Sequence, residues 1–564
     1  MSDEREQQQS SETTYSRRTI LRTTAAVIGG AALGASGAAR LVSAASPQTG
    51  PAGGLEAGTT GYYRSPAPGV PDAYTKLPPV FKSVHRTPGA GGTVTTFQIA
   101  YNPPVPLDSS NAYFQELQKR LGVTLKPTLA PADSYDTKSA VLLASGSLPD
   151  LMFLSPNAAE LKAIQQGAFA DLTPYLSGSA LHDYPNLARF PSAVWHNAAV
   201  NGKIYGVPRP RFLAGGLLMF RQDWARKFGM TSLRNAGDVT TVLSDFTYRD
   251  PDGDGHPDTY GLGSNPSGEG LSLLLGQYMF HVPNNWRLNR NGSLTSYLET
   301  DEFHSAVAYL RGLYTLKRVY DPDATSMTVT TAKNDIIAGK IGCYDDSVTA
   351  LPSITGLREK ARELNPDAEV VGLLPPGYNG GKGVTYQAGG YFGYTAIPTQ
   401  AAGDKKRVAE LLRILDYFAA PFGSEEYIFL SNGVEGVDYT RGSDGTPLLT
   451  ARGKGEIGDL PTLTNSPITL YYPGNAKTLQ DALYMQNLIR DYLEVSIKDP
   501  TLGLYSPTFV SQGPTLFQLT HDRLISIISG RASLGDLNVF IGDWKKQGGD
   551  QIRKEYEQAM RNKR

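Results

Sequence analysis

The stretch Tyr248–Leu262, YRDPDGDGHPDTYGL, places carboxylates at a spacing that suits cation binding. The four carboxylates belong to Asp250, Asp252, Asp254 and Asp258. Packed this closely, they would repel one another without a positive partner. Gly255, at the sixth position, permits a sharp turn, and His256, at the seventh, would contribute its backbone carbonyl. These are the first nine positions of an EF-hand-type loop, so the spacing predicts a structural Ca²⁺ site.

The loop departs from the EF-hand pattern where it closes. Its twelfth position is Gly261, where a bidentate glutamate is usual. The coordination would then be completed by Asp258 binding through both oxygens, by a distant side chain, or by water. The alternative is a solvated turn without an ion, because Asp, Gly and Pro favour turns in any case.

Other patterns that carry chemistry are missing from the sequence. It contains no HExxH, no G-x-S-x-G, no Walker A loop and no G-x-G-x-x-G. Cys343 is the only cysteine, which excludes an internal disulfide and a thiolate metal site. We therefore expect no enzymatic activity. The 54 acidic residues leave open a glycosidase-type pair, for which the adjacent Asp345 and Asp346 are candidates.

Length and charge limit the class of protein. A chain of 564 residues predicts two or more domains or lobes. Its 53 basic residues balance 54 acidic ones, so no basic surface for nucleic acid is expected.

The N-terminus resembles a twin-arginine export signal. Arg17 and Arg18 stand in SRRTILR, and a short Ala- and Gly-rich apolar stretch follows. Small residues near Ala44 and Ala45 would allow cleavage, so residues 1–45 are predicted to be a signal segment. We expect a periplasmic, extracellular or cell-surface protein without a lipid-bearing cysteine. An amphipathic or disordered N-terminus is the alternative, and the sequence leaves open whether the segment is cleaved.

The elements that would position these residues alternate between strand and helix. Residues 46–92, rich in Pro and Gly, predict a linker or arm. Residues 93–101 predict a strand, 111–122 a helix ended by Gly122, and 123–130 a second strand. The alternation continues along the chain and predicts a mostly parallel sheet with helices on both faces.

Six stretches, taken together and in this order, resemble the extracellular solute-binding proteins of carbohydrate ABC importers, in the branch with LplA-type and alginate-oligosaccharide-binding proteins. The stretches are GAFADLTPYL (167–176), NGKIYGVPRP (201–210), LMFRQDWARKFGM (218–230), AGKIGCYDD (338–346), GVEGVDYT (433–440) and WKKQGGDQIRKEYEQ (544–558). The resemblance covers roughly residues 93–560. It implies the α/β periplasmic-binding-protein fold of type 2, in which two lobes joined by a hinge close on a ligand.

The resemblance also implies where the lobes divide. Lobe one would comprise residues 93–212 and 384–440, and lobe two residues 213–383 and 441–564. The segments crossing between them would fall near PRPRFLAGG and TYQAGGYFGY, whose Gly pairs suit backbone rotation. In this family, Ca²⁺ loops often close with an acidic residue at the tenth position, where this chain has Thr259.

A sugar-binding cleft needs aromatic faces and planar polar groups, and the resemblance indicates which residues would supply them. The candidates are Ser155, Asn157, Arg209, Arg211, Trp286, Tyr344, Asp345, Asp346, Tyr391 and Glu435. Several have structural alternatives. Trp286 could anchor the core, and Arg209 and Arg211 could form salt bridges between lobes. Tyr391 could pack at the hinge, and Glu435 could hold a loop.

The resulting hypothesis is a Ca²⁺-stabilised solute-binding protein that delivers an oligosaccharide to the membrane permease of an ABC importer. We expect a monomer that performs no reaction. A secreted glycoside hydrolase or polysaccharide lyase is the rival hypothesis from another class. A binder of a non-sugar ligand, such as a peptide or an osmolyte, is a third. The two arginines are compatible with an acidic or a neutral sugar.

Overall fold

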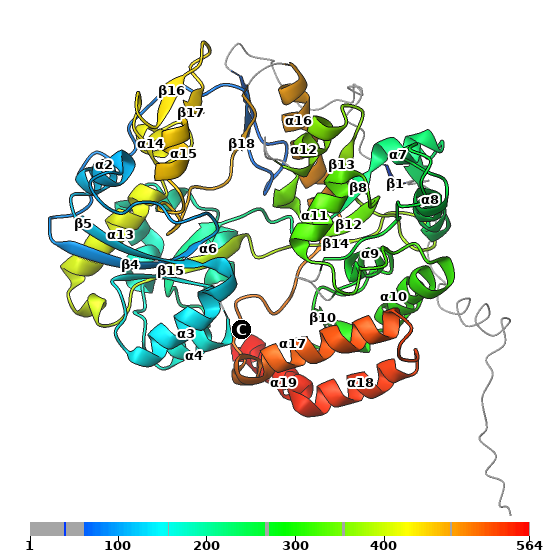
Figure 1. Ribbon diagram of the computed structural model, residues 1–564. Coiled ribbons are helices and arrows are strands. Elements are labelled where there is room, and N and C mark those ends of the chain that lie inside the picture. Colours follow the sequence, from blue (N-terminus) through cyan, green and yellow to red (C-terminus); the bar gives the residue numbers. More distant parts are fainter. Residues whose placement is uncertain are drawn as a thin grey trace, which may run out of the picture. The chain divides into compact units, whose positions relative to one another are not determined.

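The computed structural model describes residues 39–40, 61–155, 157–265, 270–351, 356–473 and 476–562 (Figure 1). The predicted signal segment lies outside these residues, apart from strand β1 (Ala39–Arg40), which pairs antiparallel with β9 (Ser232–Leu233). We call lobe one the part of the chain that packs around the five-stranded sheet β5-β4-β6-β15-β7. Lobe two is the part that packs around the three-stranded sheet β12-β8-β13.

The sheet of lobe one has the strand order β5-β4-β6-β15-β7. Its strands are β4 (Thr93–Ala100), β5 (Thr124–Pro131), β6 (Leu151–Leu154), β7 (Gly206–Pro210) and β15 (Tyr391–Ala396). Side chains along β4 alternate between two cores, with Val94 on one face and Phe97 and Ile99 on the other. Both faces of this sheet are therefore buried.

Helices cover the two faces of the lobe-one sheet (Figure 1). One face carries α2 (Ala112–Leu121), α13 (Lys405–Phe418) and α14 (Glu425–Asn432), and the other carries α3 (Tyr135–Ser145) and α4 (Ala158–Gln165). The remaining helices of this lobe are α5 (Thr173–Leu176), α6 (Ser192–Ala198) and α15 (Ala451–Glu456), and β16 (Tyr439–Arg441) and β17 (Pro447–Leu449) form a hairpin.

Local signals explain the ends of helix α2. The side chain of Asn111 accepts a hydrogen bond from the backbone N–H of Phe114 at its start. Gly122 ends it in the left-handed conformation, with φ of 71°. The helix predicted over 111–122 and the strands predicted over 93–101 and 123–130 are confirmed within one or two residues.

The sheet of lobe two has the strand order β12-β8-β13, with both pairs antiparallel. Its strands are β8 (Gly216–Arg221), β12 (Cys343–Ser347) and β13 (Val370–Leu373). The surrounding helices are α7 (Gln222–Lys227), α8 (Ala236–Tyr248), α9 (Leu273–Met279), α10 (Asp301–Gly312), α11 (Val329–Ala338), α12 (Leu357–Leu364), α16 (Ala476–Glu494), α17 (Pro507–Ile528), α18 (Asp536–Trp544) and α19 (Asp550–Asn562). Each contributes side chains to one hydrophobic core. Short strand pairs complete the lobe: β10 (Trp286–Leu288) with β11 (Leu294–Ser296), and β14 (Thr385–Tyr386) with β19 (Ser496–Ile497).

The expectation of a mostly parallel sheet holds for lobe one, where β4, β5, β6 and β7 run in one direction and β15 runs against them, but it was wrong for the β12-β8-β13 sheet of lobe two. In lobe one, β4 runs parallel to β5 and β6, but β15 runs antiparallel to β6 and β7. The reason lies in the connections between lobes. Strand β7 leads out of lobe one and its neighbour β15 leads back in, so the two must run in opposite directions. The same holds in lobe two, where β8 enters and β13 leads back toward the crossing.

The chain crosses between the lobes again near residue 465. Ile457, Leu460 and Leu463 pack in the core of lobe one, whereas Leu470 packs in the core of lobe two. The sequence prediction had placed residues 441–564 in lobe two. The structure instead places residues 441–463 with lobe one, because α15 contacts α2 and the apolar side chains that follow α15 are buried in the core of lobe one.

Part of the predicted linker is folded against both lobes. Strands β2 (Tyr62–Tyr63) and β3 (Ala73–Tyr74) form a small sheet with β18 (Leu470–Tyr471), and Ala73 is buried in the core of lobe two. Further along, the backbone N–H groups of Ser83 and Val84 donate to Glu426 of lobe one, at 2.9 and 3.2 Å. Across the residues placed by the structure, no helix combines the length and apolarity that a membrane span requires.

Candidate ligand-binding site and metal loop

Arg209 and Arg211 lie together at the first crossing, where β7 ends. Arg209 Nε and Arg211 Nη1 both donate to the side-chain oxygen of Asn465, at 3.3 and 3.2 Å. Arg211 Nη1 also donates to the backbone carbonyl of Pro210, at 3.0 Å. Within the part of the chain that the structure describes, neither guanidinium forms an ion pair with a carboxylate. The inter-lobe salt bridges considered from the sequence therefore do not form there.

The surroundings of this pair favour an incoming anion. Burial lowers the pKa of Arg211 to about 10, and the neighbouring charge of Arg209 lowers it too. Burial also lowers the pKa of Arg209. Asp459 is close enough to interact with Arg209 electrostatically, but its two oxygens accept hydrogen bonds from Tyr101 and Asn102. Both guanidinium groups remain charged at neutral pH.

Two exposed aromatic side chains flank the arginines. Tyr101 follows β4 and is 53% exposed, and Phe392 in β15 is 39% exposed. Their ring centroids are 6.3 Å apart, and the guanidinium of Arg211 lies 5.4 Å from the centroid of Phe392. Such aromatic faces can stack on the C–H faces of a sugar ring. We call Tyr101, Arg209, Arg211, Phe392 and Asn465 the arginine–aromatic cluster.

Sequence reasoning selected Tyr391 and missed Phe392. The register of β15 against β7 shifts between Tyr391 and Tyr394, because Gly393 adopts a φ of 135° and forms a bulge. As a result, Phe392 is exposed, while Tyr394 is buried in the core of lobe one. Tyr391 is half-buried against the same core, in line with the hinge-packing alternative.

A pocket in lobe two, lined by polar and apolar side chains, flanks the second crossing segment. Its lining residues are Gly270, Leu273, Leu274, Gln277, Pro283, Asn284, Asn285, Tyr297, Asp345 and Tyr386. Burial raises the pKa of Asp345 to about 6, and its Oδ1 atom has no hydrogen-bond partner among the described residues. The Asn284 side chain donates to the carbonyl of Gln387 in the crossing, at 3.2 Å. Arg211 N–H donates to Gly390, three residues further on, at 2.8 Å. The pocket and the arginine–aromatic cluster thus border one stretch of chain.

The two neighbours of Asp345 on β12 have structural roles. Tyr344 is fully buried, and its hydroxyl donates to Asp346 Oδ2, at 2.9 Å. Asp346 also accepts the backbone N–H of Ser347 and lies 3.5 Å from Lys333 Nζ. Of the three residues selected from this segment, Asp345 is the one that lines the pocket.

Ser155 and Asn157 lie at the carboxyl end of β6, as expected. Both side chains donate to Asp136 Oδ1, at 3.2 and 3.1 Å. The Asn157 side-chain oxygen also accepts the Glu160 N–H and caps helix α4. Their polar groups therefore hold local structure, and ligand contact by these two residues stays a prediction.

Trp286 and Glu435 lie in separate surroundings. Trp286 is 8% exposed in the core of lobe two, with ring centroids 6.1 Å from Trp544 and 6.0 Å from Tyr556. This burial favours the core-anchor alternative. Glu435 forms an ion pair with Arg441, at 2.9 Å, and accepts from Tyr439, at 3.0 Å, both of which belong to the β16–β17 hairpin. It holds that hairpin.

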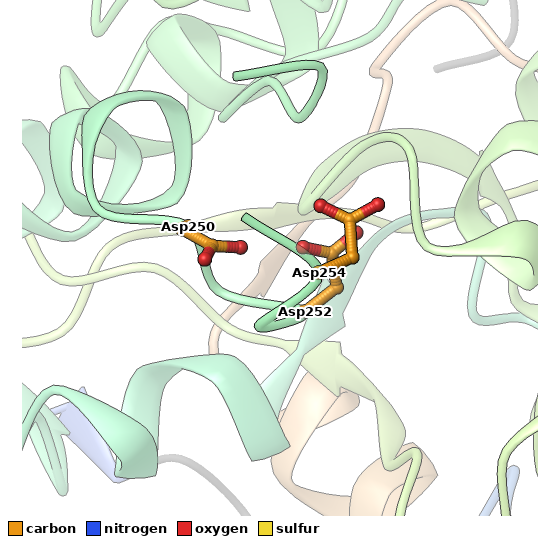
Figure 2. A group of neighbouring side chains, drawn as sticks. All are labelled: Asp250, Asp252 and Asp254. Atoms are coloured by element: carbon orange, nitrogen blue, oxygen red, sulfur yellow. The ribbon is translucent and has the colours of Figure 1, made fainter. Parts of the chain in front are cut away.

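The acidic loop gathers three of its carboxylates. Ligand oxygens of Asp250, Asp252 and Asp254 lie within 4.8 Å of one another, and Figure 2 shows these side chains around one tight turn. Gly253 and Gly255 allow the turn with φ of 81° and 84°, and their N–H groups donate to Asp250. Burial and the adjacent carboxylates of Asp250 and Asp254 raise the pKa of Asp252. An all-oxygen donor set of this kind suits a hard cation.

The other two predicted ligands are not part of this group. Asp258 is exposed and does not belong to the three-carboxylate group. His256 is exposed, and its N–H donates to Asp254, at 2.7 Å. Thr259, which stands at the tenth position of the loop, is buried and donates through its hydroxyl to Phe246. Coordination by Asp258 and by the His256 carbonyl stays a prediction.

Comparison with known proteins shows what the chain is similar to. No family model matches it. Lipoprotein LipO of Bacillus subtilis (strain 168) is 28% identical over 477 residues, covering 83% of this chain and 92% of that protein. The polygalacturonan/rhamnogalacturonan-binding protein YtcQ of the same organism is 25% identical over 526 residues, covering 90% of this chain and 96% of that protein.

Solved structures of carbohydrate-binding proteins are similar to this chain in fold. FusA of S. pneumoniae, an ABC-transporter substrate-binding protein in complex with kestose, superimposes with a TM-score of 0.63 at 15% identity, over 83% of this chain and 100% of that one. Alginate-binding protein AlgQ2 without calcium ion superimposes with a TM-score of 0.59 at 13% identity, over 85% of this chain and 99% of that one. The chain has the type 2 periplasmic-binding-protein fold. The predicted fold class and the resemblance to carbohydrate-importer solute-binding proteins are confirmed.

Proposed function

We propose that this protein is the solute-binding component of an ABC importer and captures an oligosaccharide between its two lobes. The observation that carries the proposal is the arginine–aromatic cluster beside the crossing segments, in which the side chains of Tyr101 and Phe392 are exposed. The pocket around Asp345 supplies hydrogen-bonding groups from the other lobe. The binding of polysaccharides or oligosaccharides by YtcQ and FusA supports the same ligand class.

Binding would act through an equilibrium between open and closed forms. A ligand that contacts both lobes stabilises the closed form, because it gains contacts there that the open form lacks. The crossing near Gly389 and Gly390 is built for such a rotation, since Gly390 has a φ of 78°. The membrane permease would recognise the closed, loaded form.

Binding without chemistry accounts for the site better than hydrolysis does. Asp345 and Asp346, the candidate glycosidase pair, do not face one cavity: Asp345 lines the pocket, whereas Asp346 is engaged by Tyr344 and Lys333. A retaining or inverting glycosidase needs both carboxylates at the scissile bond. YtcQ, FusA and AlgQ2 are named as binding proteins, which also favours binding.

We further propose that Asp250, Asp252 and Asp254 hold a structural Ca²⁺ in lobe two. The three oxygens within 4.8 Å of one another support this, and so does the similarity to AlgQ2, whose structure was determined without calcium ion. An ion would offset the repulsion among the carboxylates and fix the turn that follows α8. Nothing in its position calls for a catalytic role.

Export through a twin-arginine signal at residues 1–45, and action as a monomer, complete the proposal. They rest on the SRRTILR context and on the two-lobed fold, which forms a complete ligand trap within one chain.

Calorimetry with a panel of oligosaccharides, followed by chromatography of the ligand after prolonged incubation, tests the function. The expected result is saturable binding of at least one oligosaccharide, which is recovered intact. Cleavage of the bound oligosaccharide would establish the glycosidase or lyase hypothesis instead. Saturable binding of peptides or osmolytes without any oligosaccharide binding would establish the third hypothesis.

A further inference from the structure

Two cationic side chains in the arginine–aromatic cluster share a neutral acceptor. Arg209 and Arg211 both donate to the Asn465 amide oxygen, at 3.3 and 3.2 Å. Arg209 Nη1 is buried and has no hydrogen-bond partner within the described part of the chain. Nε and Nη2 of Arg211 donate to no group among the described residues. The pair therefore has unused donors next to one another.

Several other partly buried arginines of this chain pair with a carboxylate. Arg362 lies 3.0 Å from Asp481, and Arg407 lies 2.8 Å from Asp150. A guanidinium that loses water without gaining a carboxylate carries a desolvation penalty, and two such groups side by side also repel each other. The protein scaffold could have placed a carboxylate here, since Asp459 is nearby, but the oxygens of Asp459 accept from Tyr101 and Asn102.

The unused donors point to an anionic ligand group, and the neighbouring rings indicate what carries it. A planar guanidinium fork matches a carboxylate through two parallel hydrogen bonds. The exposed aromatic side chains of Tyr101 and Phe392, with ring centroids 6.3 Å apart, suit a ring with an apolar C–H face. A neutral sugar would fit the rings but would leave the two charges without a counterion. A small inorganic anion would fit the arginines but would make no use of the rings.

We propose that the arginine–aromatic cluster is a subsite for a hexuronic acid residue, with the ligand carboxylate on Arg209 and Arg211 and the sugar ring on Tyr101 and Phe392. This inference deepens the proposed function and rests on it: the imported ligand is an acidic oligosaccharide rather than a neutral one. Asn465 is a positioning residue, because it holds both guanidinium groups through one oxygen.

The test compares acidic oligosaccharides with their neutral counterparts. Calorimetry would be run with oligogalacturonate, oligomannuronate and oligoglucuronate, each also in a carboxyl-reduced form. We expect the wild-type protein to bind one of the acids at least ten-fold more tightly than its reduced form, and this preference to weaken as salt is raised. Arg211→Gln and Arg209→Gln should each lower the affinity for that acid about 10- to 100-fold. The affinity of both variants for the carboxyl-reduced form should stay within about two-fold of the wild-type affinity.

Two further variants distinguish the effect of the guanidinium geometry from the effect of charge, and from a general effect of losing an arginine. Arg211→Lys keeps the charge but loses the fork, so it should recover only part of the affinity. Arg441→Gln removes an arginine from the β16–β17 hairpin and serves as the matched control, with unchanged affinity. Melting temperatures would be recorded for every variant, and a variant that unfolds would be replaced by Asn465→Leu, which should weaken uronate binding in the same selective way.

The outcomes separate this inference from the proposed function. Tight binding of neutral oligosaccharides with no preference for the acids would overturn the uronate subsite and keep the importer function. Binding of inorganic phosphate or sulfate, abolished by Arg211→Gln, without uronate binding would also overturn it. Binding of no sugar of either kind would count against both proposals.

Discussion

The guanidinium of Arg211 lies over the ring of Phe392, 5.4 Å from its centroid. One residue follows the strand that leaves lobe one, and the other belongs to the strand that returns. The contact therefore places a positive charge and an apolar face at the point where the lobes are connected. The contacts of a ligand bound here would change when the lobes rotate relative to each other. Such a ligand can therefore shift the equilibrium between the open and closed forms of this fold.

Truncation of Phe392 tests the stacking role of the cluster. Phe392→Ala should lower oligosaccharide affinity about ten-fold or more, because an aromatic face beside a sugar contributes on the order of 1–2 kcal/mol. The melting temperature should change little, since the ring is 39% exposed. Tyr248→Ala, at an exposed aromatic of lobe two, is the control and should bind normally. Equal affinities for Phe392→Ala and wild type would remove Phe392 from the site.

Chelation tests the metal loop. The wild-type melting temperature should rise on adding Ca²⁺ and fall in excess chelator, because the ion offsets repulsion among Asp250, Asp252 and Asp254. Asp252→Ala should melt lower than the Ca²⁺-loaded wild type and should not respond to chelator. Asp258→Ala, scanned alongside, reports whether Asp258 takes part. A wild-type melting temperature that is the same with Ca²⁺ and with chelator would refute the site.

Many strands and helices of the fold could be predicted from local sequence patterns. The strand over 93–101 shows alternation, and the helix over 111–122 carries its cap residues, so neighbours in sequence define both elements. The acidic loop was recognised for the same reason, because its carboxylates are two residues apart. The directions of β15 and of the lobe-two strands were not predicted, because they depend on how two separate stretches of chain return to one sheet.

The candidate ligand site could be predicted only in part from the sequence. Arg209 and Arg211 stand in a recognisable segment, but Asn465, which orients both, is 256 residues from Arg209. Asp459 accepts a hydrogen bond from Tyr101, which is 358 residues away in the sequence, and no local sequence pattern predicts either contact. Phe392 was missed because a bulge at Gly393 changes which side chains of β15 face outward, and a strict alternation of faces assigns the exposure to the wrong residue.

Replacing Arg17 and Arg18 by lysines tests export. The residues lie outside the part that the structure describes, so the prediction rests on the SRRTILR context. The double variant should accumulate folded in the cytoplasm, whereas the wild type should appear in the exported fraction. Fractionation with antibody detection measures this, and a variant with one lysine replacement serves as the intermediate control. Normal export of the double variant would indicate another route.

Asp345 should make stability depend on pH. Burial raises its pKa from 3.8 to about 6 in the fold, so the unfolded chain ionises first as pH rises. Its stabilising effect is therefore full below about pH 4 and is lost as pH rises through 6. Asp345→Asn should be about 1–3 kcal/mol more stable than wild type at pH 7.5, with the difference shrinking toward pH 4.

Denaturant titration at several pH values measures the effect of Asp345→Asn. Asp522→Asn, whose side chain is 64% exposed, is the control and should show no such trend. A difference between Asp345→Asn and wild type that stays constant with pH would show that Asp345 is not held in its protonated form by the fold.

Trp286 gives the sharpest separation between a packing role and a ligand role. Its side chain is 8% exposed and packs against Trp544 and Tyr556, so truncation leaves a cavity in lobe two. Trp286→Ala should cost about 3–5 kcal/mol of stability, and Trp286→Phe, which keeps part of the packing, should cost less. Calorimetry on the folded protein at low temperature should give the wild-type affinity for the oligosaccharide. An unchanged melting temperature together with a ten-fold loss of affinity would contradict this and would restore Trp286 as a stacking residue. The core alternative predicts the reverse, because a side chain that is 8% exposed contributes mainly through its packing in lobe two.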